Sequence, residues 1–252
     1  MTARRRFPLH AGVASVVAVE SVTPSMRCFT LKADAFADFG LEQPGEIMTL
    51  GWPAPGRELV LPRAGWRFPP GNEAQHWRNF TVRSTDAERS VVDVDFFLHG
   101  DLGRAAAWAE RAQVGDTVGF AGPRVHWKGN GADWSLLVAD ETGLPALLAI
   151  LETLPAGHRT TALAEVGDES ERQTVETAAD LDLHWLVRGG RPPGTTTLLA
   201  DAVAELALPR GRGRVWGGGE AMAMRAVRER LRKPGRSLQA LGYWKHDRTP
   251  DW

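Results

Sequence analysis

The sequence predicts two domains of different fold class, an antiparallel β domain followed by a parallel α/β domain. Before residue 128, short β-like segments alternate with turns rich in glycine and proline, whereas after it strands alternate with helices. The chain has 252 residues, 43% of them hydrophobic, which is enough for two cores. We expect the domains to span residues 1–128 and 129–252, with the boundary in the stretch VHWKGNGAD.

The first half contains six segments that are typical of β-strands. They are rich in β-branched and aromatic residues and are bounded by turn formers. Their residue ranges are 14–22, 26–33, 46–53, 78–85, 91–99 and 116–123. An alanine-rich segment at 103–113 interrupts them and is expected to form a helix. Short strands at this spacing predict an antiparallel sandwich or barrel.

The second half alternates apolar strand-like segments with segments that are compatible with helix. The expected strands are 135–140, 161–167, 183–189, 213–219 and 238–244. The expected helices are 144–154, 169–179, 197–206 and 220–233. Such alternation predicts a five-stranded parallel sheet that is covered by helices.

The composition excludes several classes of function. A formal net charge of -1 and a pI near 6.7 argue against a general nucleic-acid binder, which needs a strong positive field. The longest apolar runs fall short of the ~20 residues that cross a bilayer, and the N-terminus lacks the apolar segment of a secretory signal. The single cysteine, Cys28, allows no internal disulfide, and the seven histidines show no metal-ligand spacing. We expect a cytoplasmic protein without stable membrane insertion and without a metal site.

Two loops of the second half follow expected strands, at the edge where open α/β sheets bind ligands. One runs from Asp140 to Pro145 and the other from Gly217 to Glu220. Glycines let a ligand approach the backbone, and the helix after each loop offers N–H groups to a phosphate. Neither loop matches a dinucleotide or P-loop fingerprint. Taken alone, Gly219 is also explained by a tight turn.

The first half has two comparable features. The segment 99–103 is a glycine-containing turn into a helix, which is either an anion site or a simple strand-to-helix connection, and His99 alone suits a structural role. The stretch HWRNFTVRS carries Arg78, Phe80, Thr81 and Arg83 together, which is more charge than an ordinary strand in a near-neutral protein needs.

Seven segments of the chain, taken in order, resemble the siderophore-interacting protein family, the flavin-dependent ferric-siderophore reductases of the ferredoxin-reductase-like superfamily. RNFTVR resembles the family's Arg-x-Tyr-Thr-x-Arg motif, and DVDFFLHGDLGRAAAWA resembles its Asp-Phe-x-Leu-His-Gly segment and the helix that follows. The other segments are VVAVESVTPSMRCFTL, GDTVGFAGPR, LLVADETGLPALLAILETLP, VWGGGEAMAMRAVRERLR and the terminal GYWK. The resemblance covers nearly the whole chain.

The resemblance implies a six-stranded antiparallel FAD-binding barrel and a parallel α/β domain that binds NADPH or NADH. It implies that Arg78 reaches the FAD pyrophosphate and that Phe80 packs along the isoalloxazine or ribityl region. Thr81 would be the catalytic contact near N5, together with the backbone of Val82. Arg83 either supports the phosphates or only pairs with a carboxylate.

The resemblance assigns further residues to the two cofactors. Those beside FAD are Asp95, Phe97, Leu98, His99, Gly103, Arg104, Ala105 and Ala106. Those that would shape the NAD(P)H site are Asp140, Glu141, Thr142, Gly217, Gly219 and Glu220. The arginines offered to a 2′-phosphate, without a clear clamp, are Arg172, Arg188 and Arg191.

Some positions depart from the family pattern. They are Thr49, Phe80, Arg104 and Ala106. Phe80 replaces a tyrosine, so its ring contact should be purely apolar. Thr49 replaces a lysine near the substrate opening, which leaves Arg124 and Lys245 as the basic residues expected to contact an anionic ferric siderophore. Lys245 is also explained as a solvated C-terminal lysine.

The implied function is electron transfer from NAD(P)H through FAD to a Fe(III)-siderophore, which releases Fe(II) for iron assimilation. Iron is then a substrate, so the chain needs no metal site of its own. We expect a monomer whose electron donor is NAD(P)H or a ferredoxin. Two alternatives stay open, a flavoprotein reductase with another acceptor and a siderophore-binding module that a ferredoxin reduces.

Overall fold

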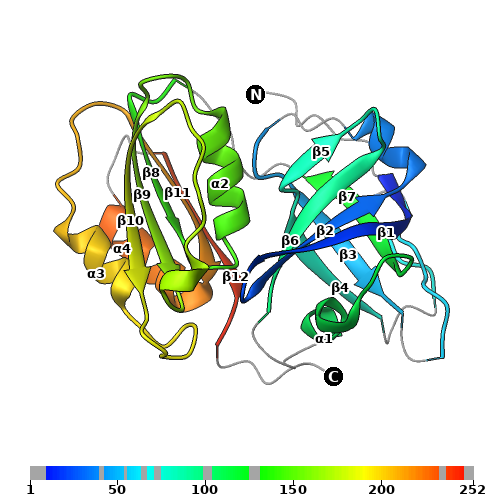
Figure 1. Ribbon diagram of the computed structural model, residues 1–252. Helices are drawn as coiled ribbons and strands as arrows, with labels where there is room; N and C mark the ends of the chain where they lie inside the picture. Colours follow the sequence, from blue (N-terminus) through cyan, green and yellow to red (C-terminus); the bar gives the residue numbers. More distant parts are fainter. Residues whose placement is uncertain are drawn as a thin grey trace. The chain divides into compact units, whose positions relative to one another are not determined.

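The structure is a computed structural model that describes residues 10–39, 43–53, 56–63, 67–70, 75–98, 104–124, 131–232 and 237–246. The chain divides into two compact units, residues 1–21 with 27–126 and residues 22–26 with 127–252. The first unit is built on an antiparallel sheet and the second on a parallel sheet with helices (Figure 1). This architecture confirms the predicted fold class.

The sheet of the first unit has seven strands in the order β4-β3-β7-β1-β2-β6-β5. The strands are β1 (His10–Thr23), β2 (Met26–Lys32), β3 (Ile47–Trp52), β4 (His76–Thr81), β5 (Ser84–Asp86), β6 (Val91–Phe97) and β7 (Thr117–Arg124). A 3-10 helix, η1 (Asp34–Asp38), follows β2, and an α-helix, α1 (Arg104–Arg111), follows β6. Six strands were expected, and the seventh arises because the segment predicted at 78–85 is two strands.

The break between β4 and β5 has a clear cause. β4 pairs with β3, whereas β5 pairs with β6 at the opposite end of the sheet order. Between the two strands, the Val82 N–H donates to the Glu46 carbonyl at 2.8 Å and the Arg83 N–H donates to the Asp93 carbonyl at 2.9 Å. The chain therefore crosses from one end of the sheet to the other, and the sheet curls into a barrel-like form (Figure 1).

Alternation along β6 separates the core from the outer face of the first unit. Val92, Val94 and Phe96 belong to the buried core, while Asp95 lies on the opposite face of the same strand. The core is strongly aromatic, and Phe36 and Phe120 meet there with ring centroids 4.6 Å apart. This packing fixes β6 and its neighbours, from which the candidate site is built.

The second unit has a five-stranded parallel sheet in the order β10-β9-β8-β11-β12. Its strands are β8 (Trp134–Ala139), β9 (Arg159–Val166), β10 (Asp180–Val187), β11 (Gly213–Glu220) and β12 (Ser237–Trp244). Its helices are α2 (Leu144–Thr153), α3 (Leu198–Glu205), α4 (Ala221–Leu231) and the 3-10 helix η2 (Glu169–Glu171). The strand order reverses direction between β8 and β11, which makes this the switch point of the sheet.

Both faces of this sheet are buried. All six residues of β8 are buried, and Leu137 packs in one hydrophobic cluster with α2 while Leu136 packs in another with α3 and α4. Figure 1 shows α2 on one side of the sheet and α3 and α4 on the other. Central parallel strands read as continuous apolar runs for this reason. No helix among the described residues is long and apolar enough to span a membrane.

One expected helix is wrong. The segment predicted at 169–179 forms only η2, and residues 172–179 are irregular. Val175 packs against the apolar cluster beside α2, and the Thr177 hydroxyl donates to the Leu151 carbonyl at 2.5 Å. β-Branched residues have low helix propensity, and here their tertiary contacts hold the chain out of a helix.

Candidate functional site

The end of β4 brings together two residues of the RNFTVR stretch on one face. Phe80 and Arg78 lie opposite Met48 and Leu50 of β3, and both β3 residues are fully buried. The half-buried Phe80 ring stacks on the ring of Phe96 with centroids 4.2 Å apart and an interplanar angle of 29°. The core thus holds the Phe80 ring in a fixed orientation.

Thr81 points to the other face of β4 and has an unusual environment. Its side chain is 5% exposed, and its hydroxyl has no hydrogen-bond partner among the described residues. A buried hydroxyl without a partner is costly, so such a group favours a ligand that accepts or donates a hydrogen bond there. The neighbouring Val82 N–H is already bonded to the Glu46 carbonyl, whereas the Thr81 hydroxyl is open, as is the buried Trp77 indole N–H of the same strand.

Arg78 is exposed at the same strand. Its Nη1 donates to the carbonyl of its own neighbour, Trp77, at 3.1 Å, and it forms no ion pair within the described residues. A guanidinium in this state suits an external phosphate. The residues of β4 therefore fit the three needs of FAD, an aromatic surface, a polar group at the ring edge and a cation for the pyrophosphate.

Arg83 is placed differently from Arg78. Its Nε lies 3.9 Å from Asp95 Oδ2, and the Asp95 side chain is 4% exposed. Of the two interpretations left open for Arg83, this geometry supports pairing with a carboxylate.

Cys28 lies in β2, next to β6 in the sheet. Burial, together with the charges of Asp95 and Asp93, raises the pKa of the Cys28 thiol, so the thiol stays protonated.

The remaining residues expected beside FAD are only partly described. Phe97 and Leu98 are half-buried at the end of β6, and Ala105 and Ala106 lie in the first turn of α1. His99 and Gly103 fall outside the described residues, as do the side chains of Arg104 and Arg124. The first N–H groups of a helix have no acceptor within the helix, so the start of α1 can bind a phosphate.

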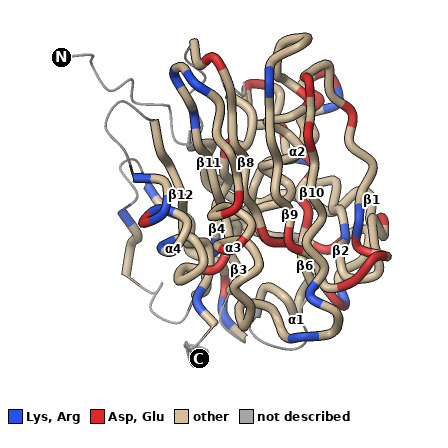
Figure 2. Tube along the Cα trace, turned by 90° about the vertical axis from the view of Figure 1, so that its left-hand side faces the viewer, with Lys and Arg blue, Asp and Glu red and all other residues tan. Residues whose placement is uncertain are grey.

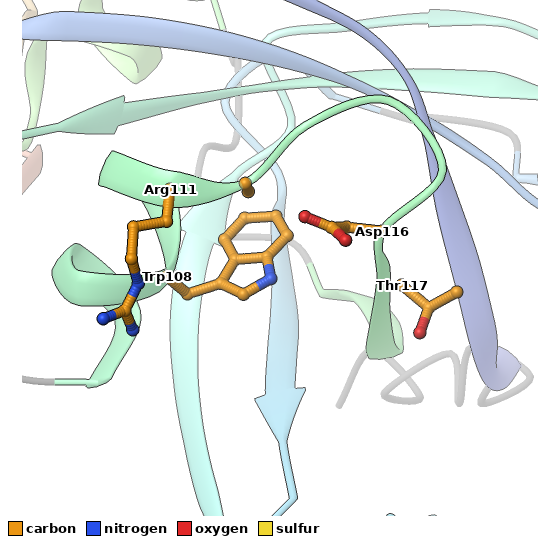
Figure 3. A pocket seen from close by; sticks show the side chains of 5 residues that line it. Trp108, Arg111, Asp116 and Thr117 are labelled. Atoms are coloured by element: carbon orange, nitrogen blue, oxygen red, sulfur yellow. The ribbon is translucent and has the colours of Figure 1, made fainter.

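A cavity of about 310 Å³ lies elsewhere in the first unit, between the end of α1 and the start of β7 (Figure 3). Its walls are Trp108, Arg111, Ala112, Asp116 and Thr117. The indole of Trp108 also contacts the core ring of Phe29, with centroids 5.0 Å apart. The cavity sits at the C-terminal end of α1, so it is separate from the N-terminal start of that helix.

In the second unit, Asp140 joins three strand ends. Its Oδ1 accepts from the N–H and the hydroxyl of Thr142 at 2.8 and 2.6 Å. Its Oδ2 accepts from the Glu220 N–H at 2.7 Å and from the Trp244 indole N–H at 2.9 Å. A Cβ at Gly219 would lie 2.8 Å from the Asp140 carboxyl carbon. Gly219 is therefore explained by this close approach rather than by a tight turn.

Glu220 caps α4 with its side chain. Its Oε2 accepts from the N–H groups of Met222 and Ala223 at 2.6 and 2.8 Å. The Asp140 carboxylate likewise accepts from the Thr142 N–H. These N–H groups near the two helix starts are the ones expected from the sequence to bind a phosphate, and carboxylates of the chain already occupy them. The expectation that both loops present free helix N-termini is wrong for these donors, because carboxylates of the chain fill the role of an anion.

Glu141 lies beside Asp140 but faces a different partner. Its carboxylate makes a bidentate ion pair with Arg188, with N–O distances of 2.8 and 2.6 Å. Arg188 is 4% exposed, so it cannot serve a 2′-phosphate. Arg172 pairs with Glu169 at 2.7 Å, and the Arg191 Nε donates to the Arg188 carbonyl at 2.9 Å.

The ligand edge of this sheet also has residues that the motifs do not single out. Trp244 reaches Asp140 across 104 positions of sequence, and Gly194 packs against it, since a Cβ there would lie 2.8 Å from the indole. The GYWK match was the one signal that could have indicated Trp244. Lys245 follows it and is exposed, and Gly217 lies within β11. Acidic and basic residues are both scattered along the described chain of the two units (Figure 2).

Comparison with known proteins gives a consistent picture. The siderophore-interacting FAD-binding domain matches residues 15–127, and the siderophore-interacting protein domain matches residues 132–247. A siderophore utilization protein from T. fusca is 35% identical, with a TM-score of 0.87 over 97% of this chain and 96% of that chain. The siderophore-interacting protein of Aeromonas hydrophila is 27% identical, with a TM-score of 0.80 over 95% of this chain and 93% of that one.

Curated relatives agree with these structures. A ferric vibriobactin reductase of Vibrio cholerae is 30% identical over 187 residues, which are 69% of this chain and 66% of the relative, slightly under two thirds of its length. An NADPH-dependent ferric-chelate reductase of Escherichia coli is 27% identical over 96% of this chain and 95% of the relative. With both domain matches in order and a full-length structural counterpart, the chain belongs to the siderophore-interacting protein family.

Proposed function

We propose that this protein is a flavin-dependent ferric-siderophore reductase, which takes electrons from NAD(P)H and delivers them to Fe(III) in a siderophore. The observation that carries the proposal is the buried hydroxyl of Thr81, which has no partner among the described residues and follows the stacked Phe80 at the end of β4, in a chain of this family. The names of the relatives from Vibrio cholerae and Escherichia coli support the same activity.

The first unit would hold FAD through residues of β4 and α1. Bound FAD exchanges a hydride with NAD(P)H and single electrons with a ferric chelate. Phe80, which Phe96 supports from behind, would pack on the flavin, and the Thr81 hydroxyl would form a hydrogen bond at the ring edge. Arg78 and the first turn of α1 would hold the pyrophosphate. Phe97 and Leu98 would line the cofactor at the end of β6.

The second unit would bind NAD(P)H at the switch point between β8 and β11. Thr142 would face the nucleotide, because it lies at this edge. The expectation for Gly217 is not supported, because Gly217 is buried within β11 and a Cβ there would lie 3.0 Å from the Met224 sulfur of α4. Asp140 and Glu220 would shape the site rather than touch the phosphates, since their carboxylates are bonded to N–H groups of the chain. Siderophores bind Fe(II) more weakly than Fe(III), so the reduced iron would then be released.

The substrate would be an anionic ferric siderophore, which Arg124 and Lys245 would attract at the opening. We propose that the protein works as a monomer in the cytoplasm. A ferredoxin is the second candidate for the electron donor. Arg172 and Arg188 form ion pairs with carboxylates, whereas the exposed Arg191 donates only to a backbone carbonyl within the described residues, so Arg191 is the one of the three that could reach a 2′-phosphate.

The test starts with an absorption spectrum of the purified protein and an anaerobic titration with NADH and with NADPH. We expect flavin bands that bleach on titration and return when a ferric siderophore is added, with Fe(II) captured by a chromogenic chelator. A protein that binds no flavin would refute the proposal. If only a reduced ferredoxin reduces the flavin, ferredoxin replaces NAD(P)H as the proposed electron donor. If only quinones reoxidise the reduced flavin, a quinone replaces the ferric siderophore as the proposed electron acceptor.

A further inference from the structure

Three buried charged residues meet at the ligand edge of the five-stranded sheet. They are Glu141, Glu165 and Arg188, which are 2%, 5% and 4% exposed. Glu141 follows β8, Glu165 is near the end of β9, and Arg188 follows β10. These three strands are neighbours in the sheet and run in parallel (Figure 1), so one guanidinium connects three strand ends.

The contacts of Arg188 are uneven. Nη1 and Nη2 bind the two oxygens of Glu141 at 2.8 and 2.6 Å, which is the fork-to-fork geometry of a strong ion pair. Nη1 lies 3.6 Å from Glu165 Oε1, and that oxygen also accepts from the Thr196 hydroxyl at 2.8 Å. Arg188 is therefore bonded mainly to Glu141, and Glu165 is a secondary neighbour.

Glu141 and Asp140 tie one loop to opposite halves of the sheet. Asp140 binds Glu220 of β11 and Trp244 of β12, on one side of the switch point. Glu141 binds Arg188, which follows β10, on the other side. The loop from 140 to 143 straddles the switch point, where ligands of such sheets bind. Two consecutive carboxylates thus hold it from both sides.

Fold stability does not explain this arrangement. Burial raises the pKa of Glu141 and of Glu165, even though Arg188 opposes the shift. Asp140 adds a third negative charge near the cluster, although its carboxylate is bonded to Thr142, Glu220 and Trp244 rather than to Arg188. Apolar residues of similar size often stabilise a fold as well as a buried ion pair does. The ion pair between Glu141 and Arg188 does add one thing that apolar residues would not, because it fixes the orientation of the loop from 140 to 143.

We propose that Arg188 is a positioning residue for the nicotinamide nucleotide, acting through Glu141 on the loop from 140 to 143. The inference rests on the proposed function, because it assigns the loop to NAD(P)H. Arg188 does not touch the nucleotide. It keeps Thr142 and the start of α2 at the switch point, so its loss weakens nucleotide binding and leaves the flavin in the other unit in place.

The experiment compares Glu141→Gln, Arg188→Lys and Arg188→Met with the matched variant Glu165→Gln. Steady-state KM is measured for NADH and for NADPH. Separately, the enzyme is reduced with dithionite and its reoxidation by a ferric siderophore is followed. Glu165→Gln is matched because Glu165 is equally buried and contacts the same guanidinium, but does not belong to the loop.

We expect KM to rise about three- to thirty-fold in Glu141→Gln, a range typical of coupling through a network residue. Arg188→Lys keeps the charge but loses the bidentate geometry, so its KM should lie between those of wild type and Arg188→Met. Flavin content and reoxidation should match wild type in all variants, and Glu165→Gln should keep KM within about two-fold, below the range of network coupling.

Two results would overturn the inference. One is an unchanged KM for NADH and NADPH in Glu141→Gln. The other is an equal rise of KM in Glu165→Gln, because it would show that the buried charges act through the stability of the whole domain rather than through the loop. If Arg188→Met does not fold, the other two variants still decide. A wild-type protein that oxidises neither NADH nor NADPH removes the proposed function together with this inference. An active wild type with an unchanged Glu141→Gln removes the inference alone.

Discussion

Thr81 is a residue whose surroundings do not match its chemistry. Among the described residues its hydroxyl is buried without a partner, whereas the Thr30 hydroxyl donates to Asp93 Oδ1 at 2.7 Å. The fold of the first unit therefore carries the cost of a polar group that only a ligand satisfies. Strain of this kind is expected at functional sites rather than in ordinary cores.

Replacing Thr81 by valine should separate stability from cofactor binding. In flavin-free protein, Thr81→Val removes the unpartnered hydroxyl and should stabilise the fold by about 1 kcal/mol. FAD affinity should fall roughly ten-fold, because one hydrogen bond is lost. Thermal unfolding of the apoprotein and FAD titration by fluorescence check both effects. Thr30→Val is the control, and it should destabilise the apoprotein without changing FAD affinity. Lower apoprotein stability in Thr81→Val would contradict the assignment.

Arg78 should matter for FAD through charge. Arg78→Ala is expected to weaken FAD binding by roughly ten- to one hundred-fold, the value of a charge-assisted phosphate contact. Arg78→Lys should recover part of the loss, since lysine supplies the charge without the fork. Flavin retained after dialysis is the measurement, with the exposed Arg89→Ala as control. Full flavin occupancy in Arg78→Ala would rule out the phosphate contact.

At the scale of the element, the ligand edge of the parallel sheet depends on close approach between strands. Gly143 packs so tightly that a Cβ there would lie 2.0 Å from the Gly218 carbonyl oxygen, and Gly219 packs on the Asp140 carboxylate. β8 and β11 can thus bring their loops together only with glycine at these positions. The glycines from Gly217 to Gly219 are therefore explained by close packing between the strand ends, whether or not they also contact a ligand.

Gly219→Ala should disturb this edge. The added methyl group would displace Asp140 and with it the bonds to Glu220 and Trp244, at a cost of about 1–3 kcal/mol. We expect a lower Tm and a higher KM for NAD(P)H. Gly167→Ala is the control, because its nearest neighbour would be the Arg188 Nη2 at 3.5 Å, an ordinary contact. Equal behaviour of the two variants would show that the Asp140 contact is unimportant.

Stability of the second unit should depend on pH through Glu165. Burial raises its pKa above the ordinary 4.5, so the folded chain binds the proton more tightly than the unfolded chain. This contribution is complete below about pH 4.5 and is lost as the pH rises through the raised pKa. Glu165→Gln removes the ionisation, so its stability relative to wild type should be higher at pH 8 than at pH 5. Chemical denaturation at both pH values checks this, and a constant difference would contradict it.

At the scale of the whole molecule, the net charge of the protein is too small to attract a charged substrate over a long distance. The net charge is -1, and both signs are scattered over the two units (Figure 2). Under the proposed function, an anionic ferric siderophore would therefore be attracted by local basic residues such as Lys245 rather than by the field of the whole protein.

Lys245→Ala tests this local steering. We expect KM for an anionic ferric siderophore to rise several-fold, with a smaller salt dependence, while flavin content and reduction by NAD(P)H stay unchanged. A neutral ferric chelate serves as the control substrate and should be used equally well by both proteins. Identical saturation curves for the anionic substrate would return Lys245 to the role of a solvated lysine.

Local sequence gave the element types reliably where periodicity was strong. The segments that correspond to β8 and β6 were predicted to be strands, and both form strands. The segment at 169–179 misled, because its charges are compatible with a helix while Thr177 bonds to Leu151, 26 positions away. Likewise the strand at 78–85 looked continuous, since the switch of pairing partner at Val82 is not encoded in its own residues.

The sequence by itself determined the two-domain order, the family and the motif of Arg78, Phe80 and Thr81, because these depend on residue type and local spacing. Only the tertiary structure decided what the carboxylates of the second unit do. Asp140 binds groups 80 and 104 positions away, and Glu141 binds Arg188 across 47 positions. Such partners are chosen by how parallel strands bring their ends to one edge, and no short stretch of sequence records that choice.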